Sequence, residues 1–213
     1  PILFFGNEFF DAIPIKQFLI KNREIYEKFI ELNGGKFKKF HLKKTTSKII
    51  GELKELGLIE RFRFVEFPKM GLNILKILIK KIKKFKGGVL LIDYGYTVPN
   101  GLDTLQSIKS HKTNKFYKNI GKADITYLVN FKLLKEFFEK NSLHSNKIVN
   151  QNFFLKRMGI SERAEILSKG MTFKEKSDLY FRLERLLSEK KMGTLFKVIL
   201  ATNKKSKFNL GFK

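Results

Sequence analysis

The chain has 213 residues and a mass of 25.0 kDa, and its 43% hydrophobic and 30% charged residues exclude an intrinsically disordered protein. It has no cysteine, which excludes disulfides and thiolate chemistry, and 3 histidines make a histidine-rich metal site unexpected. Its net charge is +24, and no apolar run reaches the ~18 residues that a transmembrane helix needs.

The first elements are predicted from apolar runs and turn signals. Residues 1–6 form an apolar run typical of a buried strand, and because no methionine precedes it we expect a fragment that opens within a domain. A helical or irregular stretch is expected from about residue 9 to residue 20. Asn33-Gly34-Gly35, between residues 24–32 and 36–42, predicts a β-hairpin because Asn and Gly tolerate positive φ.

The next segment predicts a short helix and a strand. Thr46 or Ser47 is expected to cap a helix that ends at Gly57. Residues 61–67 alternate weakly, as in a strand, and Pro68 closes this segment.

Residues 72–86 predict a basic amphipathic helix. Six lysines separate apolar residues that recur at helical spacing, namely Ile74, Leu75, Leu78, Ile82 and Phe85. Such a helix suits an anionic membrane surface. The sequence runs directly through Gly87-Gly88 into the apolar run 89–92, which favours a helix that covers a parallel sheet.

The remaining elements complete one α/β unit without internal repeats. Thr172 and Glu175 form a capping-box pattern at the start of a long helix. The predicted elements are a strand at 123–129, helices at 131–141, about 151–158, from 161 and from 172 to about 191, and a strand at 194–201.

Acidic residues follow two of the predicted strands. Glu8 and Asp11 come after the strand 1–6, and Asp93 comes directly after the strand 89–92. In open α/β sheets ligands bind beyond the carboxyl ends of the strands, where carboxylates orient cations or act as bases. The alternative is that these acids cap the segments after the strands, and two neighbouring strand ends favour a site.

These residues carry a family resemblance. The segment Asn7 to Pro14 resembles the Asn-Glu-Phe-Phe-Asp-Ala-Leu-Pro signature of the MidA-type methyltransferases, which include a mitochondrial complex I assembly methyltransferase. Further ordered segments resemble the same family over nearly the whole chain. They are 87–88 with 91–96, 103–106 with His111, 121–126, Gln151 with 154–155, 159–160, and 192–193 with 195–198.

The sequence also departs from the family pattern. Asn130 stands where the family usually has Asp, and Ile120 where it usually has Pro. No glycine-rich strand-to-helix turn of the kind that holds S-adenosylmethionine is found in the sequence. By the resemblance, residues 1–213 form the C-terminal part of one methyltransferase domain, with a Rossmann-like class I fold from strand four onward, a β-hairpin and helical insertions. The first three strands, which bind the cofactor, are expected to be missing.

The resemblance implies methyl transfer from S-adenosylmethionine to a protein arginine on a core subunit of respiratory complex I. Glu8 and Asp11 are expected to grip the guanidinium as catalytic acids, and Asn7 is expected to lie on the cofactor side. Asp93 and Tyr94 are expected to line the substrate channel, with a capping and packing role as the alternative. His111 is a candidate proton acceptor or a surface histidine. We expect residues 1–213 alone to be inactive.

The sequence leaves three other functions open. The charge suggests a nucleic-acid-binding module, but 37 of the 44 basic residues are lysine, a bias typical of an AT-rich genome, so no specific nucleic acid is expected. Pairs such as Phe4-Phe5, Phe137-Phe138 and Phe153-Phe154 are interpreted as core. A peripheral membrane protein and a non-catalytic remnant are the others. The expected partners are a protein substrate and the missing N-terminal half, in the bacterial cytoplasm or, for a eukaryotic source, the mitochondrial matrix.

Overall fold

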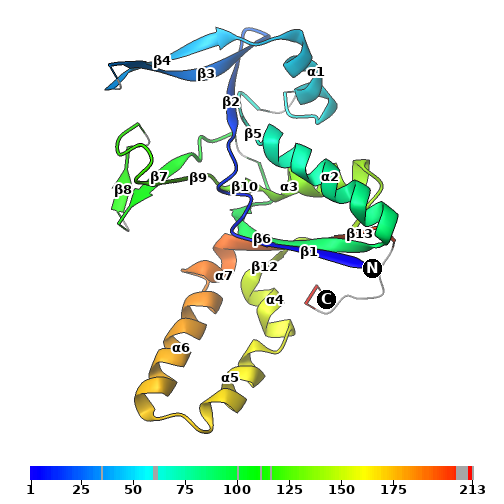
Figure 1. The fold of residues 1–213 in the computed structure, drawn as a ribbon, viewed down its shortest axis with the longest axis vertical. Helices are drawn as coiled ribbons and strands as arrows, with labels where there is room; N and C mark the ends of the chain where they lie inside the picture. Colours follow the sequence, from blue (N-terminus) through cyan, green and yellow to red (C-terminus); the bar gives the residue numbers. More distant parts are fainter. Residues whose placement is uncertain are drawn as a thin grey trace. The chain divides into compact units, whose positions relative to one another are not determined.

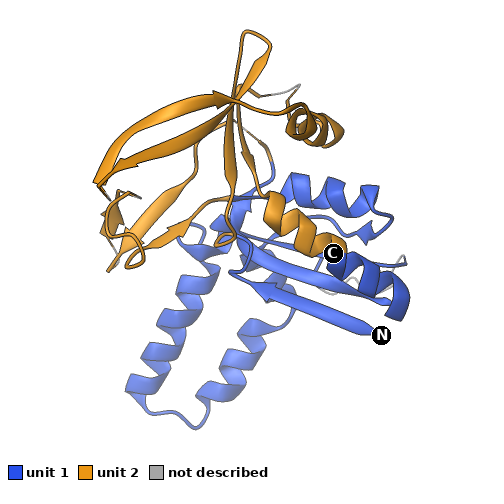
Figure 2. Cartoon of the chain, turned by 45° about the horizontal axis from the view of Figure 1, so that its top comes forward, with its two compact units in different colours: residues 1–10, 77–97, 129–213 blue, residues 11–76, 98–128 orange. Residues whose placement is uncertain are grey.

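The chain forms two compact units, coloured separately in Figure 2. Unit 1 comprises residues 1–10, 77–97 and 129–213, and unit 2 comprises residues 11–76 and 98–128. The chain therefore leaves unit 1 twice to build unit 2. The computed structural model describes residues 1–34, 36–59, 62–99, 101–110, 112–115, 117–204 and 211–212.

Unit 1 is built on a mixed sheet whose central strand is β6 (Gly87–Tyr96). β1 (Ile2–Asn7) pairs with β6 in parallel, with Asn7 opposite Ile92, and β13 (Phe196–Thr202) pairs with β6 in antiparallel orientation. Parallel neighbours need a crossover connection, as the sequence predicted. The short strands of this sheet are β10 (Val129–Asn130), β11 (His144–Ser145) and β12 (Val149–Asn150).

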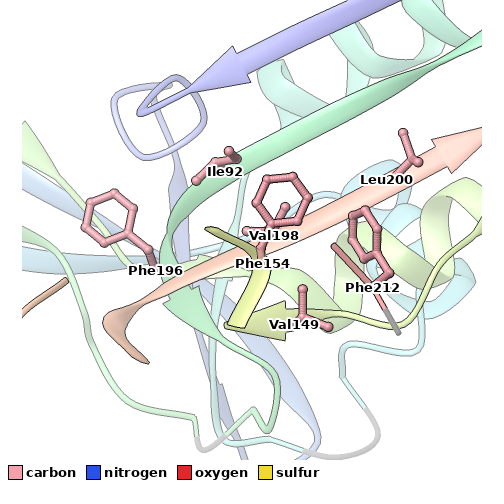
Figure 3. Packing of buried hydrophobic residues seen from close by; sticks show 7 residues of the cluster. All are labelled: Ile92, Val149, Phe154, Phe196, Val198, Leu200 and Phe212. Carbon is pink, nitrogen blue, oxygen red and sulfur yellow. The ribbon is translucent and has the colours of Figure 1, made fainter. Parts of the chain in front are cut away.

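One hydrophobic cluster of unit 1 lies against one face of this sheet. Figure 3 shows a cluster in which side chains from the strands meet Phe154 and Phe212, whose rings are 5.3 Å apart. Val198, at the centre of β13, is fully buried. Burying large apolar side chains from several elements is the main force that holds such a unit together. The other members are Ile92, Val149, Phe196 and Leu200.

Two helices of unit 1 begin at side-chain caps. The Asn130 side chain accepts a hydrogen bond from Leu133 N, so an amide caps the helix where the family usually has an acid. The predicted capping box is confirmed, because Thr172 N donates to Glu175 Oε2 at 2.8 Å, and this bond lowers the pKa of Glu175. The described helices that lie wholly within unit 1 are α3 (Phe131–Lys140), α4 (Gln151–Arg157), α5 (Ile160–Ser168), α6 (Phe173–Leu187) and α7 (Met192–Leu195) (Figure 1).

In its described residues, unit 2 contains two antiparallel sheets, one short helix and the first part of helix α2 (Lys69–Phe85). The first sheet has the strand order β4-β3-β2-β5, and the second has the order β8-β7-β9. Helix α1 (Ser47–Glu55) begins after Thr46, whose side chain accepts a hydrogen bond from Ile49 N. The strands are β2 (Lys16–Lys21), β3 (Glu24–Asn33), β4 (Lys36–Lys44), β5 (Phe64–Phe67), β7 (Gln106–Lys109), β8 (Lys112–Asn114) and β9 (Asp124–Thr126).

The expectation of a helical or irregular stretch from residue 9 to residue 20 is wrong for its second half. β2 pairs with β3 on one side and with β5 on the other. Phe18 is fully buried, with its ring 6.3 Å from that of Phe67. A short apolar run without clear alternation does not separate strand from helix, and here the two neighbouring strands decide.

Helix α2 (Lys69–Phe85) buries one apolar side against the rest of the protein. Leu72, Leu75, Ile79 and Ile82 are buried at spacings of three and four residues, while the lysines between them are exposed. The apolar side is therefore occupied by packing, which favours the sheet-covering interpretation over a membrane-surface helix. Among the described residues, the helices are too short or too polar to span a bilayer.

The interpretation of the phenylalanine pairs as core is confirmed in part. Phe137, Phe138 and Phe154 are buried, as expected. Phe5 is 64% exposed and Phe153 is 38% exposed, so those two assignments are wrong. Phe5 lies on β1 at the edge of the described sheet, where one side of the strand has no neighbouring strand.

Candidate functional site

The turn that follows β1 is held by Asp93 at the end of the neighbouring strand β6. Asp93 is only 2% exposed. Its Oδ2 accepts hydrogen bonds from Phe10 N at 2.8 Å and Phe9 N at 3.2 Å, and its Oδ1 accepts one from Tyr94 N at 3.0 Å. The carboxylate thus satisfies backbone N–H groups on both strand ends, which is the task of a cap.

The same turn presents Asn7 and Glu8 on the open side. Both residues are exposed, and Glu8 N donates a hydrogen bond to Ile92 O at 3.0 Å. Glu8 has φ 46°, a left-handed conformation that residues other than glycine adopt at a cost of about 1–3 kcal/mol. Asn7 ends a strand that runs parallel to β6, and this edge of an α/β sheet is where ligands bind.

Asp11 belongs to unit 2, whereas Glu8 belongs to unit 1. The side chain of Asp11 is buried at 5% exposure, and its backbone oxygen accepts a hydrogen bond from Tyr127 N at 3.3 Å. Asp11 also lines a pocket of about 450 Å³ within unit 2, next to Ile13 and Tyr127. The two predicted acids are three residues apart in the chain, but they belong to different units, and Glu8 is exposed whereas Asp11 is buried.

The other predicted site residues have structural contacts or fall outside the described residues. The ring of Tyr94 meets that of Phe196 edge to face at 5.4 Å and packs on the core of unit 1. Gln151 is buried and donates a hydrogen bond to Leu186 O, as expected of a satisfied amide. His111 lies outside the described residues. A substrate role for Asp93, Tyr94 and His111 stays a prediction.

A third buried carboxylate, Glu66 of β5, was missed by the sequence analysis. Its Oε1 accepts hydrogen bonds from Gln17 Nε2 and Thr104 N, both at 3.0 Å, and its Oε2 accepts one from Thr104 Oγ1 at 2.5 Å. Burial raises the pKa of Glu66, and the bonds from Thr104 and Gln17 oppose that rise. The available signal was the single acid in the apolar strand Phe64–Phe67.

Gln17 and Thr104 extend this network within unit 2. Gln17 Nε2 also donates to Asp103 Oδ1 at 2.6 Å, and Thr104 Oγ1 accepts a hydrogen bond from Leu128 N. Asp103 in turn forms an ion pair with Lys28 at 2.8 Å. Asp103 and Thr104, which the resemblance singled out, therefore fasten a loop to the four-stranded sheet.

Comparison with known proteins assigns the family. A protein-family profile described as "Putative S-adenosyl-L-methionine-dependent methyltransferase" matches residues 1–149. The chain belongs to this methyltransferase family. The resemblance drawn from residues 7–14 and the later segments is thus confirmed.

Relatives and solved structures agree with this assignment. The chain is 25% identical to "Protein arginine methyltransferase NDUFAF7, mitochondrial" of Danio rerio over 94% of the chain and 47% of that protein. The Mus musculus protein of the same name is 29% identical over 91% of the chain and 44% of its own length. The chain therefore spans about half the length of the curated relatives it matches.

Two solved structures from Burkholderia thailandensis show the fold. An uncharacterised superfamily protein has a TM-score of 0.76 at 21% identity, and the match covers 99% of this chain and 56% of that one. A second structure, bound to S-adenosyl-homocysteine, has a TM-score of 0.74 at 19% identity over 99% of this chain and 54% of that one. The Rossmann-like α/β fold that the resemblance implied is confirmed.

The described residues supply only one part of a binding site for the family's cofactor, S-adenosylmethionine. The left-handed turn at Glu8 leaves two polar side chains, Asn7 and Glu8, open beyond the carboxyl ends of β1 and β6. A glycine-rich turn between a strand and a helix, which would hold the methionine part, does not occur among the described residues. Nor do those residues bring together three or more acids or histidines able to hold a metal ion.

Proposed function

We propose that this chain is the C-terminal part of an S-adenosylmethionine-dependent protein arginine methyltransferase, acting on a core subunit of respiratory complex I. The observation that carries the proposal is the turn after β1, in which Asp93 holds the backbone while Glu8 is turned out in a left-handed conformation. A rigid turn at the carboxyl ends of parallel strands can hold a side chain in the position needed to orient a substrate. The names of the relatives support an arginine acceptor and a mitochondrial setting for those relatives.

The proposed chemistry needs the acceptor arginine to be oriented by acids. When bound, the cofactor would supply an electrophilic methyl group to a guanidinium nitrogen of the acceptor; the N–C bond would form as the S–C bond breaks, and the proton of that nitrogen would pass to water. Glu8 accepts hydrogen bonds from the other N–H groups and keeps positive charge away from the attacking nitrogen, and the same role for Asp11 stays a prediction. Asn7, next to Glu8, orients the cofactor side of the site.

The cofactor site is completed by the part of the domain that corresponds to the other half of the relatives. β1 lies at the edge of the described sheet, and Leu3 and Phe5 on it are 66% and 64% exposed. An apolar edge strand invites pairing with a further strand. We therefore place the strands of the N-terminal half beside β1, and we expect residues 1–213 alone to transfer no methyl groups.

The test is Glu8→Gln in the longest form of the protein that its gene encodes. Transfer of a labelled methyl group to protein arginine should fall by about a hundredfold or more, because the amide no longer accepts charge-assisted bonds from the guanidinium. Affinity for S-adenosylmethionine, measured by calorimetry, should stay within about twofold, since Glu8 holds the acceptor. The matched control is Glu165→Gln, an exposed glutamate of α5.

Three results would contradict the proposal in different ways. Undiminished turnover in Glu8→Gln would remove Glu8 from the mechanism. Transfer only to another nucleophile would leave a methyltransferase but overturn the arginine assignment. A wild-type protein that binds no S-adenosylmethionine would favour the non-catalytic remnant.

A further inference from the structure

Helix α6 of unit 1 has an apolar stripe on its exposed side. The helix contacts α4, α5 and α7, and its leucines at positions 179, 183 and 186 are half-buried. On the opposite side of the helix, Phe173, Tyr180 and Phe181 are 89%, 44% and 66% exposed. Phe173, Ser177 and Phe181 follow one another at spacings of four residues, so they lie in one line along the helix. We call Phe173, Ser177, Tyr180 and Phe181 the α6 stripe.

The two ends of the α6 stripe are held in a defined shape. The capping box of Thr172 and Glu175 fixes the first turn, which contains Phe173. At the other end, the Nζ atom of Lys191 lies 5.3 Å from the centre of the Phe181 ring, and the same ammonium group forms an ion pair with Glu184. A surface that is already ordered loses little conformational entropy when a partner binds.

The segment that carries the stripe is nearly neutral in a very basic chain. Figures 1 and 2 show α5 and α6 projecting away from the sheet of unit 1. Residues 160–187, which we call the α5–α6 arm, contain six basic and five acidic residues, a net charge of +1 in a chain of +24. An acidic partner would be drawn to the lysines of the remaining residues. The arm therefore suits a partner that is not acidic.

The α6 stripe is also symmetric about Ser177. Phe173 comes four residues before this serine, and Phe181, with Tyr180 beside it, comes four residues after it. A two-fold symmetric contact needs a patch that fits itself. When two copies of α6 cross in antiparallel orientation at Ser177, Phe173 of each copy meets Tyr180 and Phe181 of the other. The small serine lets the helix axes approach to about 8 Å.

The charges beside the stripe fit the same arrangement. Lys174 and Asp178 lie on one flank of the stripe, before and after Ser177, and both are exposed. The antiparallel crossing brings Lys174 of each copy close to Asp178 of the other. Exposed ion pairs add little affinity, but they favour this orientation of the two helices. The aromatic rings supply the affinity and the charges supply the direction.

We propose that two copies of this protein associate through the α6 stripe, with their α6 helices antiparallel and crossing at Ser177. The inference is independent of the proposed methyl transfer, because the stripe contains none of the residues assigned to that reaction. The lysine-rich remainder of each copy opposes the contact, but α6 is about 22 Å long and charges act over only about 8 Å at physiological salt. The contact is small, so the dimer should be reversible, with a dissociation constant in the micromolar range.

Analytical ultracentrifugation of the longest encoded form measures this equilibrium. Dimers should form as the protein concentration rises. Raising the salt concentration from about 0.05 M to about 0.5 M should strengthen the dimer at least about threefold, because salt screens the repulsion between like-charged copies. Phe173→Ser and Phe181→Ser should each weaken it at least about tenfold, since each change occurs twice in the dimer. Ile77→Ser, at a 57% exposed residue on α2 of unit 1, is the control and should change nothing.

A single thiol tests the geometry of the crossing. Residues 1–213 contain no cysteine, so Ser177→Cys places one thiol at the proposed two-fold axis. With any other cysteine of the longest encoded form replaced by serine, mild oxidation by diamide should join two copies of this variant through a disulfide. Ser47→Cys, at an exposed serine at the start of α1, is the control and should give at most about a tenth of that product.

Four outcomes would overturn the inference. They are a monomer at every concentration, a dimer that added salt weakens, a dimer that neither phenylalanine substitution changes, and equal cross-linking of the two cysteine variants. Circular dichroism shows whether each phenylalanine variant keeps its helices. Ser177→Cys changes a single atom, so it tests the contact even where a phenylalanine variant does not fold.

Discussion

Replacement of Asp93 by alanine should destabilise unit 1 strongly. The Asp93 carboxylate is 2% exposed and accepts hydrogen bonds from the backbone N–H groups of Phe9, Phe10 and Tyr94. Alanine removes both oxygens, and the turn after β1 cannot replace them with helix or ladder bonds. Phe10, itself 1% exposed, then holds its N–H away from water.

The size of the effect follows from these contacts. A hydrogen bond to a charged group contributes about 1.5–3 kcal/mol, and the bond to Phe10 N at 2.8 Å is the shortest and most buried of the three. Because three bonds to one carboxylate are not additive, we expect a total loss of about 3–5 kcal/mol. That is a large share of the ~5–15 kcal/mol that stabilises an ordinary domain.

Urea unfolding of the longest encoded form, followed by fluorescence and circular dichroism, measures this loss. Asp178→Ala, at an exposed aspartate of α6, is the control and should change stability by less than about 0.5 kcal/mol. A loss below about 1 kcal/mol for Asp93→Ala would refute the capping role. Asp93→Asn keeps one acceptor oxygen, so stability retained with methyl transfer lost would instead place Asp93 in the substrate channel.

Two further predictions concern stability. Burial raises the pKa of Glu66 above its ordinary value of 4.5, so ionisation of this carboxyl group opposes folding. The free energy of unfolding of the wild-type protein, measured with urea, should therefore fall as the pH rises from 4.5 through the raised pKa. Glu66→Gln, which keeps an acceptor for Gln17, should lack this fall. Gly95→Ala would put a Cβ 2.1 Å from Val129 O and should lower the melting temperature, at a cost of about 1–3 kcal/mol. Gly51→Ala, in open space on α1, should raise the melting temperature, because alanine should increase the free energy of unfolding by about 0.5–1 kcal/mol. Equal melting temperatures for the two alanine variants would contradict the packing argument.

The elements with strong local signals could be predicted from the sequence. The apolar runs that became β1 and β6, the cap at Thr46 and the box at Thr172 all depend on residues within a few positions of one another. The parallel pairing of β1 and β6 followed from the helix and glycines before residue 89, and it brought the two acidic strand ends together. Local sequence patterns do not show which segments pair when they are far apart in the sequence. β2 was therefore missed, because its partners β3 and β5 decide its conformation.

The candidate site shows the same limit at the level of single residues. Asp93 was expected on equal terms as a channel residue or a cap, and its three backbone bonds come partly from residues more than eighty positions away. Asp103 and Thr104 lie in a segment shared with the family, yet their contacts are with Gln17, Glu66 and neighbouring backbone rather than with an open site. A motif shared by a family therefore includes residues that fasten one segment to another. Glu8 differs from them in being exposed and held in a left-handed turn, which is why it, and not Asp103, is the first residue to test for chemistry.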